Sequence, residues 1–355
     1  MKFLKSVFLF LLTFAVTFIF TDFFIQSSEI MSVSFDQVHK QNGAMYKPNA
    51  QTMFLNEGFH LGQINNNGYL GNNYPPKKQD KSFRIALLGD SFVEGFQVFD
   101  RHHFRNLLES KLNKTHDYID YEVLNFGRGE FNLSNTYAYH QNFVQKFQPD
   151  LTLIFLSKND LFSTEANWTL KPYCYIDNDS LEIKKDVSDH PIYKRKEFIN
   201  NFSNHIATLR LLSNCHRLVQ KGLLPHIVFD KFNALFGNEK PEVKQEEQEV
   251  SKDELDETML AILNKISQTD DFIFVFRDQE PFPKDIHNYI SSLGIEIIDL
   301  SNPLMELKEN NINPTYWEVT GKIGHWNHEG HKAVANHIYE KLLTIRGDLT
   351  AFKDK

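Results

Sequence analysis

The chain has 355 residues, enough for one large domain or two small ones with a sizeable hydrophobic core. Its formal net charge is −8 at pH 7 and it has no long basic stretch, which argues against nucleic-acid binding, since that requires a cationic surface facing phosphates. Aromatic residues are abundant, with 32 Phe, and many lie in apolar runs typical of a protein core.

The N-terminus, residues 1–25, has the pattern of a membrane segment. Lys2 and Lys5 precede an uncharged apolar run that lasts until Asp22 and, with Phe23–Ile25, reaches the ~20 residues needed to span a bilayer. Lysines before the run and an acid after it favour a cytoplasmic N-terminus and an extracytoplasmic remainder. No small-x-small cleavage site follows, so we favour an uncleaved anchor over a cleaved signal peptide.

Residues 26–82 show little hydrophobic periodicity and are interpreted as a polar lead-in. Its last part, INNNGYLGNNYPPKKQDK over residues 64–81, is rich in turn-forming residues. The pattern changes at Phe83–Leu88, where a continuous apolar run predicts a buried parallel strand. We therefore expect the folded domain to cover residues 83–350.

This first strand runs into Gly89-Asp90-Ser91, with Gly95 four residues beyond the serine. Glycine permits a tight turn, and ligands bind at the carboxyl ends of central strands in open α/β sheets. Ser91 is therefore a candidate nucleophile, although the same tripeptide also suits an ordinary turn.

Two further strands are followed by groups that could bind an oxyanion. After Tyr121–Asn125 comes a glycine loop with Gly127 and Gly129, whose backbone N–H groups are hydrogen-bond donors. After Leu151–Leu156 comes Asn159, whose side-chain amide is an uncharged donor. Both segments also fit simple turns or a helix cap.

The run from residue 161 to about 250 interrupts the pattern of strands. It contains Cys174 and Cys215, which an extracytoplasmic compartment would allow to pair, although two unpaired thiols fit equally well. It also contains a helical part around Phe198–Phe236, and a charged segment, Asn238–Glu257, that we interpret as an exposed or mobile linker. The insertion fits a lid, a substrate-contacting subdomain or mere decoration.

Strands and helices alternate along the rest of the domain, which predicts βαβ units and a parallel sheet covered by helices on both faces. Ser134 is a plausible N-cap for its helix. The further strands are expected at Phe272–Phe276 and Ile295–Leu300, and the helices at His102–Leu112, Ser134–Phe147, Asp253–Gln268, Lys284–Leu293 and Glu329–Thr344.

The C-terminal segment GKIGHWNHEGHKAVANHI, residues 321–338, supplies a candidate base. His325 lies in a loop before a helix, and imidazole is suited to take a proton from a serine near neutral pH. His328 lies nearby, and His331 and His337 fall inside the predicted helix. A zinc site is the competing interpretation, but these histidines lack an acidic or thiolate complement. We expect no cofactor.

Together these segments resemble the SGNH (GDSL-type) hydrolase family over about residues 83–345. The family is defined by four short blocks in this order, each at a strand end. In this sequence they are Gly89-Asp90-Ser91, the loop Asn125–Glu130, Asn159-Asp160, and His325-Trp326-Asn327 followed by Gly330-His331. The resemblance implies a three-layer α/β/α sandwich, flavodoxin-like, with about five parallel strands.

The resemblance also implies functions for individual residues. Ser91 would be the nucleophile and His325 the base, while the N–H groups of Ser91 and Gly129 and the Asn159 amide would form the oxyanion hole. Because the family glycine usually aligns nearer to Glu130, the Glu130 backbone is an alternative donor.

The Asp that the family usually places two or three residues before the histidine is missing, since Lys322 and Ile323 occupy those positions. Either Ser91 and His325 act as a dyad, with a backbone carbonyl or Glu318 orienting the ring, or activity is reduced or absent.

These observations predict a membrane-anchored, extracytoplasmic serine esterase or O-acyltransferase acting on O-acetyl or other acyl esters of envelope or secreted glycans. A lipid ester is a second possible substrate. The alternative is a catalytically weak or inactive SGNH-like module that binds glycan or acts as a scaffold.

Overall fold

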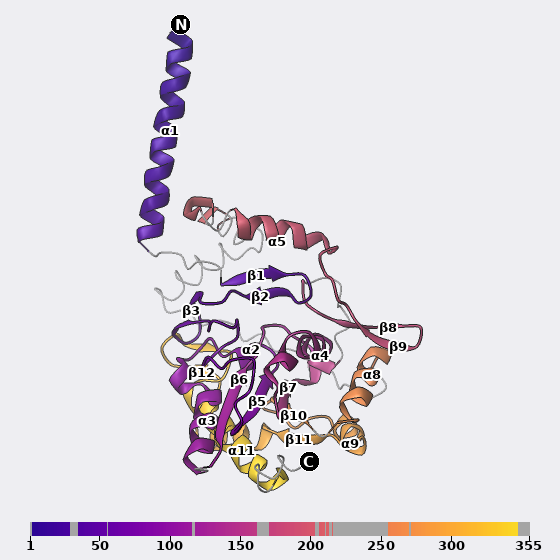
Figure 1. The fold of residues 1–355 in the computed structure, drawn as a ribbon. Coiled ribbons are helices and arrows are strands. Elements are labelled where there is room, and N and C mark those ends of the chain that lie inside the picture. Colours follow the sequence, from indigo (N-terminus) through magenta and orange to yellow (C-terminus); the bar gives the residue numbers. More distant parts are fainter. Residues whose placement is uncertain are drawn as a thin grey trace. The chain divides into compact units, whose positions relative to one another are not determined.

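The computed structural model describes residues 2–28, 35–54, 56–115, 118–161, 170–202, 206–209, 211–212, 215, 255–269 and 271–346 (Figure 1). The chain divides into two compact units. One comprises Met1–Ser34 and Lys194–Gln248, and the other comprises Phe35–Tyr193 and Glu249–Lys355. Two segments expected from the sequence lie largely outside the described residues. They are the linker at 238–257 and the helical part around 198–236.

In the first unit, the N-terminal apolar segment forms one helix, α1 (Lys2–Ser27), of 26 residues. Its length and composition make it a candidate membrane span, and a signal sequence would meet the same criteria.

The second unit is built on a five-stranded parallel sheet, as predicted. Every residue of β5 (Ser82–Leu88), β7 (Leu151–Leu156) and β10 (Phe272–Phe276) is buried, which explains their predominantly apolar sequences. The strand order is β11-β10-β7-β5-β6, which is the 2-1-3-4-5 order of flavodoxin-like folds when the strands are counted along the chain. The strands are β5 (Ser82–Leu88), β6 (Asp120–Asn125), β7 (Leu151–Leu156), β10 (Phe272–Phe276) and β11 (Glu296–Asp299).

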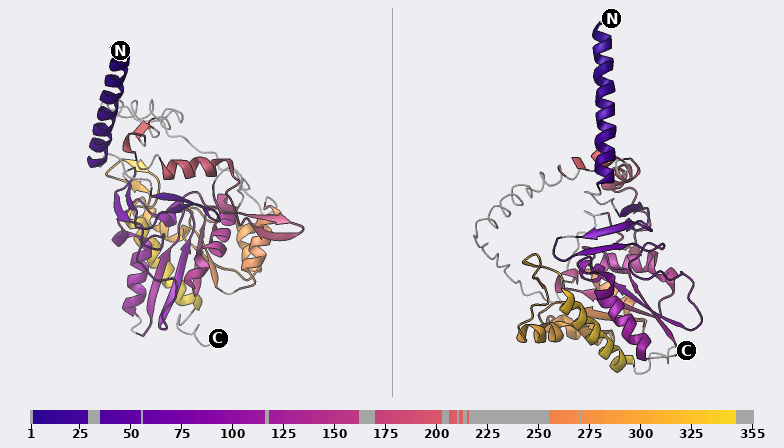
Figure 2. Two further views of the ribbon diagram at one scale, coloured as in Figure 1. Left: turned by 45° about the horizontal axis from the view of Figure 1, so that its top comes forward. Right: turned by 90° about the vertical axis from the view of Figure 1, so that its left-hand side faces the viewer.

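Helices cover both faces of this sheet and complete a three-layer sandwich (Figures 1 and 2). Ile85 and Leu87 of β5 face one core, with α3 (Phe104–Thr115), α10 (Ser301–Glu309) and α11 (His328–Arg346). Ala86 and Leu88 face the other core, with α4 (Leu133–Asn142), α8 (Glu257–Ile266) and α9 (Lys284–Ser292). The alternation along β5 thus places apolar side chains in both cores.

Two helix details differ from the sequence predictions. Asn132, not Ser134, is the N-cap of α4, because its side chain accepts the Asn135 N–H while the Asn135 side chain accepts the Asn132 N–H. Helix α10 was not expected from the sequence. Within the described residues, short 3₁₀ helices lie at Asp100–His102 (η1), Val144–Phe147 (η2) and Lys158–Leu161 (η3).

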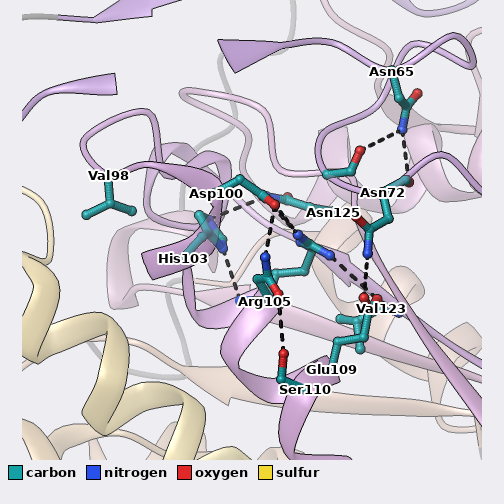
Figure 3. A network of polar contacts seen from close by, with 12 residues as sticks. Asn65, Asn72, Val98, Asp100, His103, Arg105, Glu109, Ser110, Val123 and Asn125 are labelled. Carbon is teal, nitrogen blue, oxygen red and sulfur yellow. Dashed lines mark hydrogen bonds and ion pairs between the residues drawn. The ribbon is translucent and has the colours of Figure 1, made fainter. Parts of the chain in front are cut away.

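The part of the lead-in that begins at Phe35 belongs to the same unit as the sheet. It forms two hairpins between residues 36 and 63. These are β1 (Asp36–His39) with β2 (Gly43–Tyr46), and β3 (Gln51–Phe54) with β4 (His60–Gln63). A polar network holds the segment that follows against α3, with Asn72 donating to Glu109 while Asp100 pairs with Arg105 (Figure 3). The lead-in is therefore fixed to the edge of the sheet that β6 forms.

Within the insertion, residues 170–202 contain the hairpin of β8 (Cys174–Asp177) and β9 (Ser180–Ile183), followed by α5 (Pro191–Asn201). Both cysteines are free thiols, Cys174 buried and Cys215 exposed. A fourth hairpin, β12 (Tyr316–Trp317) with β13 (Lys322–Ile323), lies just before the C-terminal histidines in the sequence.

Candidate active site

Ser91 lies where the chain turns sharply out of β5. Gly89 has φ +150°, and a Cβ there would lie 2.8 Å from a methyl of Val93, so only glycine fits. Asp90 caps the one-turn helix α2 (Ser91–Glu94) by accepting the Phe92 N–H at 3.0 Å. This turn places Ser91 between the ends of β5 and β7, the switch point where flavodoxin-like sheets bind ligands.

His325 meets Ser91 as the sequence analysis expected. The imidazole Nε2 lies 2.8 Å from Ser91 Oγ, within hydrogen-bond distance, although 234 residues separate the two along the chain. His325 lies in the loop between β13 and α11, and its ring rests on Phe92 with the ring centroids 4.6 Å apart. A serine hydroxyl and its candidate base therefore share one site.

Glu57 occupies the place of the missing Asp. Its carboxylate oxygens lie 2.9 and 3.1 Å from His325 Nδ1, and one of them also accepts the His325 backbone N–H at 2.8 Å. A Cβ on Gly324 would lie 2.4 Å from the Glu57 carboxyl carbon, so a larger residue before the histidine would displace the Glu57 carboxylate from this position. Glu318, considered from the sequence, is exposed, and Glu57 holds the ring instead.

The lead-in segment that carries Glu57 is fixed to the β12–β13 hairpin. Thr320 Oγ1 donates to the Glu57 carbonyl at 2.7 Å, and Lys322 Nζ donates to Asn56 Oδ1 at 2.8 Å. Gly58 packs so closely on Trp317 that a Cβ there would lie 2.3 Å from the indole ring. Glu57 therefore has a fixed approach to His325.

Sequence reasoning missed Glu57, because an acid in an aperiodic segment 268 residues from its partner carries no local signal. The available hints were the missing Asp and the glycine at position 324.

The charge of Glu57 is matched to this position. Burial raises the pKa of Glu57, but the hydrogen bonds from His325 and the positive charges of His325 and Lys322 outweigh it, so the pKa lies below its ordinary value. A carboxylate that accepts Nδ1–H orients the ring, leaves Nε2 free to accept the serine proton, and stabilises the imidazolium that results.

Asn159 lies in η3, exposed, in a segment tied to the serine turn. The neighbouring Asp160 lies 3.8 Å from Arg277, and Arg277 also bonds Asp90 and covers the Phe92 ring at 4.2 Å. These contacts hold the η3 segment near the start of α2. The side-chain amide of Asn159 therefore lies at the same edge of the sheet as Ser91.

The glycine loop after β6 packs directly on α2. A Cβ on Gly127 would lie 2.4 Å from the Glu94 nitrogen, so the two backbones are in close contact. The Gly129 N–H, expected from the sequence to bind an oxyanion, donates to Glu94 Oε1 at 3.3 Å. Glu130 has φ +60°, a left-handed conformation that favours glycine. It stands near the position where the SGNH family, which the sequence resembles, usually has a glycine.

His331, another histidine of the C-terminal segment, lies in the packing between α11 and α3. His331 is buried on α11, and its Nδ1 accepts the Phe104 N–H at 3.2 Å, which indicates a structural function. In the described part of the chain no three His, Cys, Asp or Glu side chains come together as metal ligands would.

No protein-family model matches the chain, and no curated protein sequence matches it significantly. Solved structures do. A member of the lipolytic protein G-D-S-L family from Veillonella parvula is 11% identical, with 73% of this chain and 97% of that one covered and a TM-score of 0.35. An acetylxylan esterase from Geobacillus stearothermophilus, solved as a catalytic mutant, is 11% identical, with 73% and 94% covered and a TM-score of 0.38. A lipase/acylhydrolase from Enterococcus faecalis is 11% identical, with 74% and 96% covered and a TM-score of 0.36.

The G-D-S-L family, which the sequence resembles, is thus represented among the solved structures similar to this chain. Identities and TM-scores this low carry no argument about activity or substrate, so the chemistry rests on this chain's own residues.

Proposed function

We propose that this protein is a serine ester hydrolase or O-acyltransferase. The observation that carries the proposal is the continuous line of contacts from Ser91 Oγ through the His325 ring to the Glu57 carboxylate, at 2.8 and 2.9 Å. Hydroxyl, imidazole and carboxylate in this order are the groups that generate a nucleophile from serine.

In the proposed reaction Ser91 Oγ attacks the ester carbonyl carbon while His325 Nε2 takes the hydroxyl proton. Glu57 stabilises the imidazolium. The oxyanion is bound by the Ser91 N–H, the Asn159 amide, and the N–H of Gly129 or of Glu130. Collapse of the intermediate breaks the bond to the alcohol, which leaves with the proton from Nε2. Water or a sugar hydroxyl then attacks the acyl-Ser91 ester by the same route and restores the serine.

The cellular setting is part of the proposal. Lys2 and Lys5, at the N-terminal end of α1 and ahead of its apolar stretch, support a single-pass anchor with a cytoplasmic N-terminus and an extracytoplasmic catalytic domain. In that setting we propose O-acetyl or other acyl esters of envelope or secreted glycans as substrates. The net charge of −8 argues against an interaction with nucleic acid.

The alternative of an inactive binding module was motivated by the absent Asp before His325. Glu57 supplies a carboxylate to the same ring nitrogen, so that motive no longer holds.

The test uses the full chain purified in detergent and p-nitrophenyl esters of increasing acyl length. Wild-type protein should hydrolyse at least the acetyl ester, and a fluorophosphonate should label Ser91. Ser91→Ala should abolish both, and hydrolysis that survives this substitution would remove the nucleophile from the proposal.

A further inference from the structure

Glu94, three residues after Ser91, holds the glycine loop against α2. Its Oε1 accepts the Gly129 N–H at 3.3 Å and a hydrogen bond from the Tyr46 hydroxyl. The Tyr46 hydroxyl also lies 3.3 Å from the Gly127 carbonyl oxygen. One carboxylate thus joins the serine helix, the lead-in and the loop that follows β6.

The surroundings compensate part of the cost of burying the Glu94 carboxylate. Arg128 stacks on the Tyr46 ring at 3.7 Å, and its Nη2 donates to the Ala44 carbonyl at 3.0 Å and lies 3.3 Å from an Asp36 oxygen. Burial raises the pKa of Glu94, and the charge of Arg128 and the hydrogen bonds from Tyr46 and Gly129 offset part of that effect. The carboxyl group is therefore an integral, low-mobility part of the loop's support.

With the Gly129 N–H engaged, the next N–H along the loop is that of Glu130. No residue in the described ranges accepts a hydrogen bond from it. Glu130 keeps a left-handed φ of +60° although it is not glycine, and Lys171 Nζ fixes its carbonyl oxygen at 2.6 Å. Backbone strain of this kind is concentrated at functional sites, where the surrounding structure maintains it.

We infer that Glu94 is a positioning residue that occupies the Gly129 N–H and so presents the Glu130 N–H as the loop's donor to the oxyanion. The inference rests on the proposed function and decides between the two donors left open there. Glu94 acts through the loop backbone and takes no proton from the substrate.

The two possible donors predict opposite effects of removing Glu94. If Glu94 positions the loop, Glu94→Ala removes the acceptor of the Gly129 N–H and leaves the Tyr46 hydroxyl with only the Gly127 carbonyl as acceptor, so the loop relaxes and kcat falls. If the Gly129 N–H is itself the donor, Glu94 blocks it in the resting structure, and Glu94→Ala raises kcat or leaves it unchanged.

The experiment measures kcat and KM for p-nitrophenyl acetate with full-length wild type, Glu94→Ala, Glu94→Gln and Tyr46→Phe, with the exposed Glu318→Gln as control. We expect kcat of Glu94→Ala to fall about tenfold or more with KM changed less than about threefold, because oxyanion contacts act mainly in the transition state. Glu94→Gln, whose amide oxygen can accept both hydrogen bonds, should restore kcat to within about threefold of wild type. Tyr46→Phe, which keeps the ring on Arg128, should fall between the two.

A boronic acid provides a second readout, because its tetrahedral adduct with Ser91 places an oxygen in the oxyanion hole. In Glu94→Ala the inhibition constant of the boronic acid should rise by the same factor by which kcat falls. A purely structural function for Glu94 would lower the melting temperature without this parallel change, and that result would overturn the inference. If Glu94→Ala does not fold, Tyr46→Phe and Glu94→Gln decide it.

Three further results would overturn the inference while the proposed function stands: an unchanged or higher kcat in Glu94→Ala, a Glu94→Gln variant as impaired as Glu94→Ala, or an unaffected Tyr46→Phe. Wild-type protein that neither hydrolyses the ester nor reacts with the fluorophosphonate would overturn both.

Discussion

Replacement of Glu57 by Gln tests the least expected part of the site. Gln keeps the length of the side chain and an acceptor oxygen for His325, so the substitution removes mainly the charge. In the structure the Glu57 carboxylate lies 2.9 Å from His325 Nδ1, where it would face the imidazolium formed in the transition state.

The expected loss follows from that distance. Two unit charges about 3 Å apart attract by roughly 5–6 kcal/mol at an effective dielectric constant of about 20. Each ~1.4 kcal/mol corresponds to a factor of ten in rate, so the full attraction is equivalent to about four powers of ten. The side chains of His325 and Glu57 are 22% and 11% exposed, and solvent screens part of the attraction. We therefore expect kcat of Glu57→Gln to fall about 10³-fold, somewhat less than the ~10⁴-fold loss known for removal of the acid in Ser-His-Asp triads.

The assay is steady-state hydrolysis of p-nitrophenyl acetate, with kcat and KM determined separately and folding checked by circular dichroism. Glu318→Gln, at an exposed position between β12 and β13, is the matched control and should retain wild-type kcat. A Glu57→Gln variant that keeps more than about a tenth of wild-type kcat would refute the reasoning, since the ring would then need no carboxylate.

Three further predictions concern the same site. Gly324→Ala should impair kcat about as much as Glu57→Ala, because its methyl would lie 2.4 Å from the Glu57 carboxyl carbon and displace it; normal kinetics would contradict the packing described here. Asn159→Ala should lower kcat about 10²-fold with little change in KM if the Asn159 amide binds the oxyanion. An equal loss in Asn159→Asp would show that a carboxylate cannot replace the amide as hydrogen-bond donor. Because the pKa of Glu57 is lowered in the folded protein, its stabilising contribution is present at pH values above the unfolded pKa, about 4.5, and is lost as the pH falls through the folded value. Urea denaturation should therefore show a difference in unfolding free energy between wild type and Glu57→Gln that shrinks on acidification below that point, and a difference that grows there would contradict the direction of the shift.

The sheet could be predicted because its signal is local. Parallel strands buried on both faces have continuous apolar sequences, as Ile85–Leu88 and Phe272–Phe276 do, and their order along the chain fixed which ends would meet. Ser91 and His325 could be predicted because each follows or precedes a regular element at a defined edge.

The remainder of the site depends on contacts that no local pattern encodes. Glu57 and Tyr46 lie in a segment without periodicity, and their partners are distant in sequence, so only the folded chain reveals them. Helix α10 was not expected from the sequence, and its Pro303 lies in the first turn, where proline is well tolerated. Asn132 and Ser134 are both good N-caps, and the reciprocal bond to Asn135 decides between them.

The placement of Glu57 has a consequence for the newly made chain. The ribosome adds Glu57 and Ser91 well before His325, which follows Glu57 by 268 residues along the chain. A partly synthesised molecule that has Ser91 but not yet His325 lacks the imidazole that is proposed to deprotonate the serine. Under the proposed chemistry, translation itself thus delays ester-cleaving activity until the segment that carries His325 has been made.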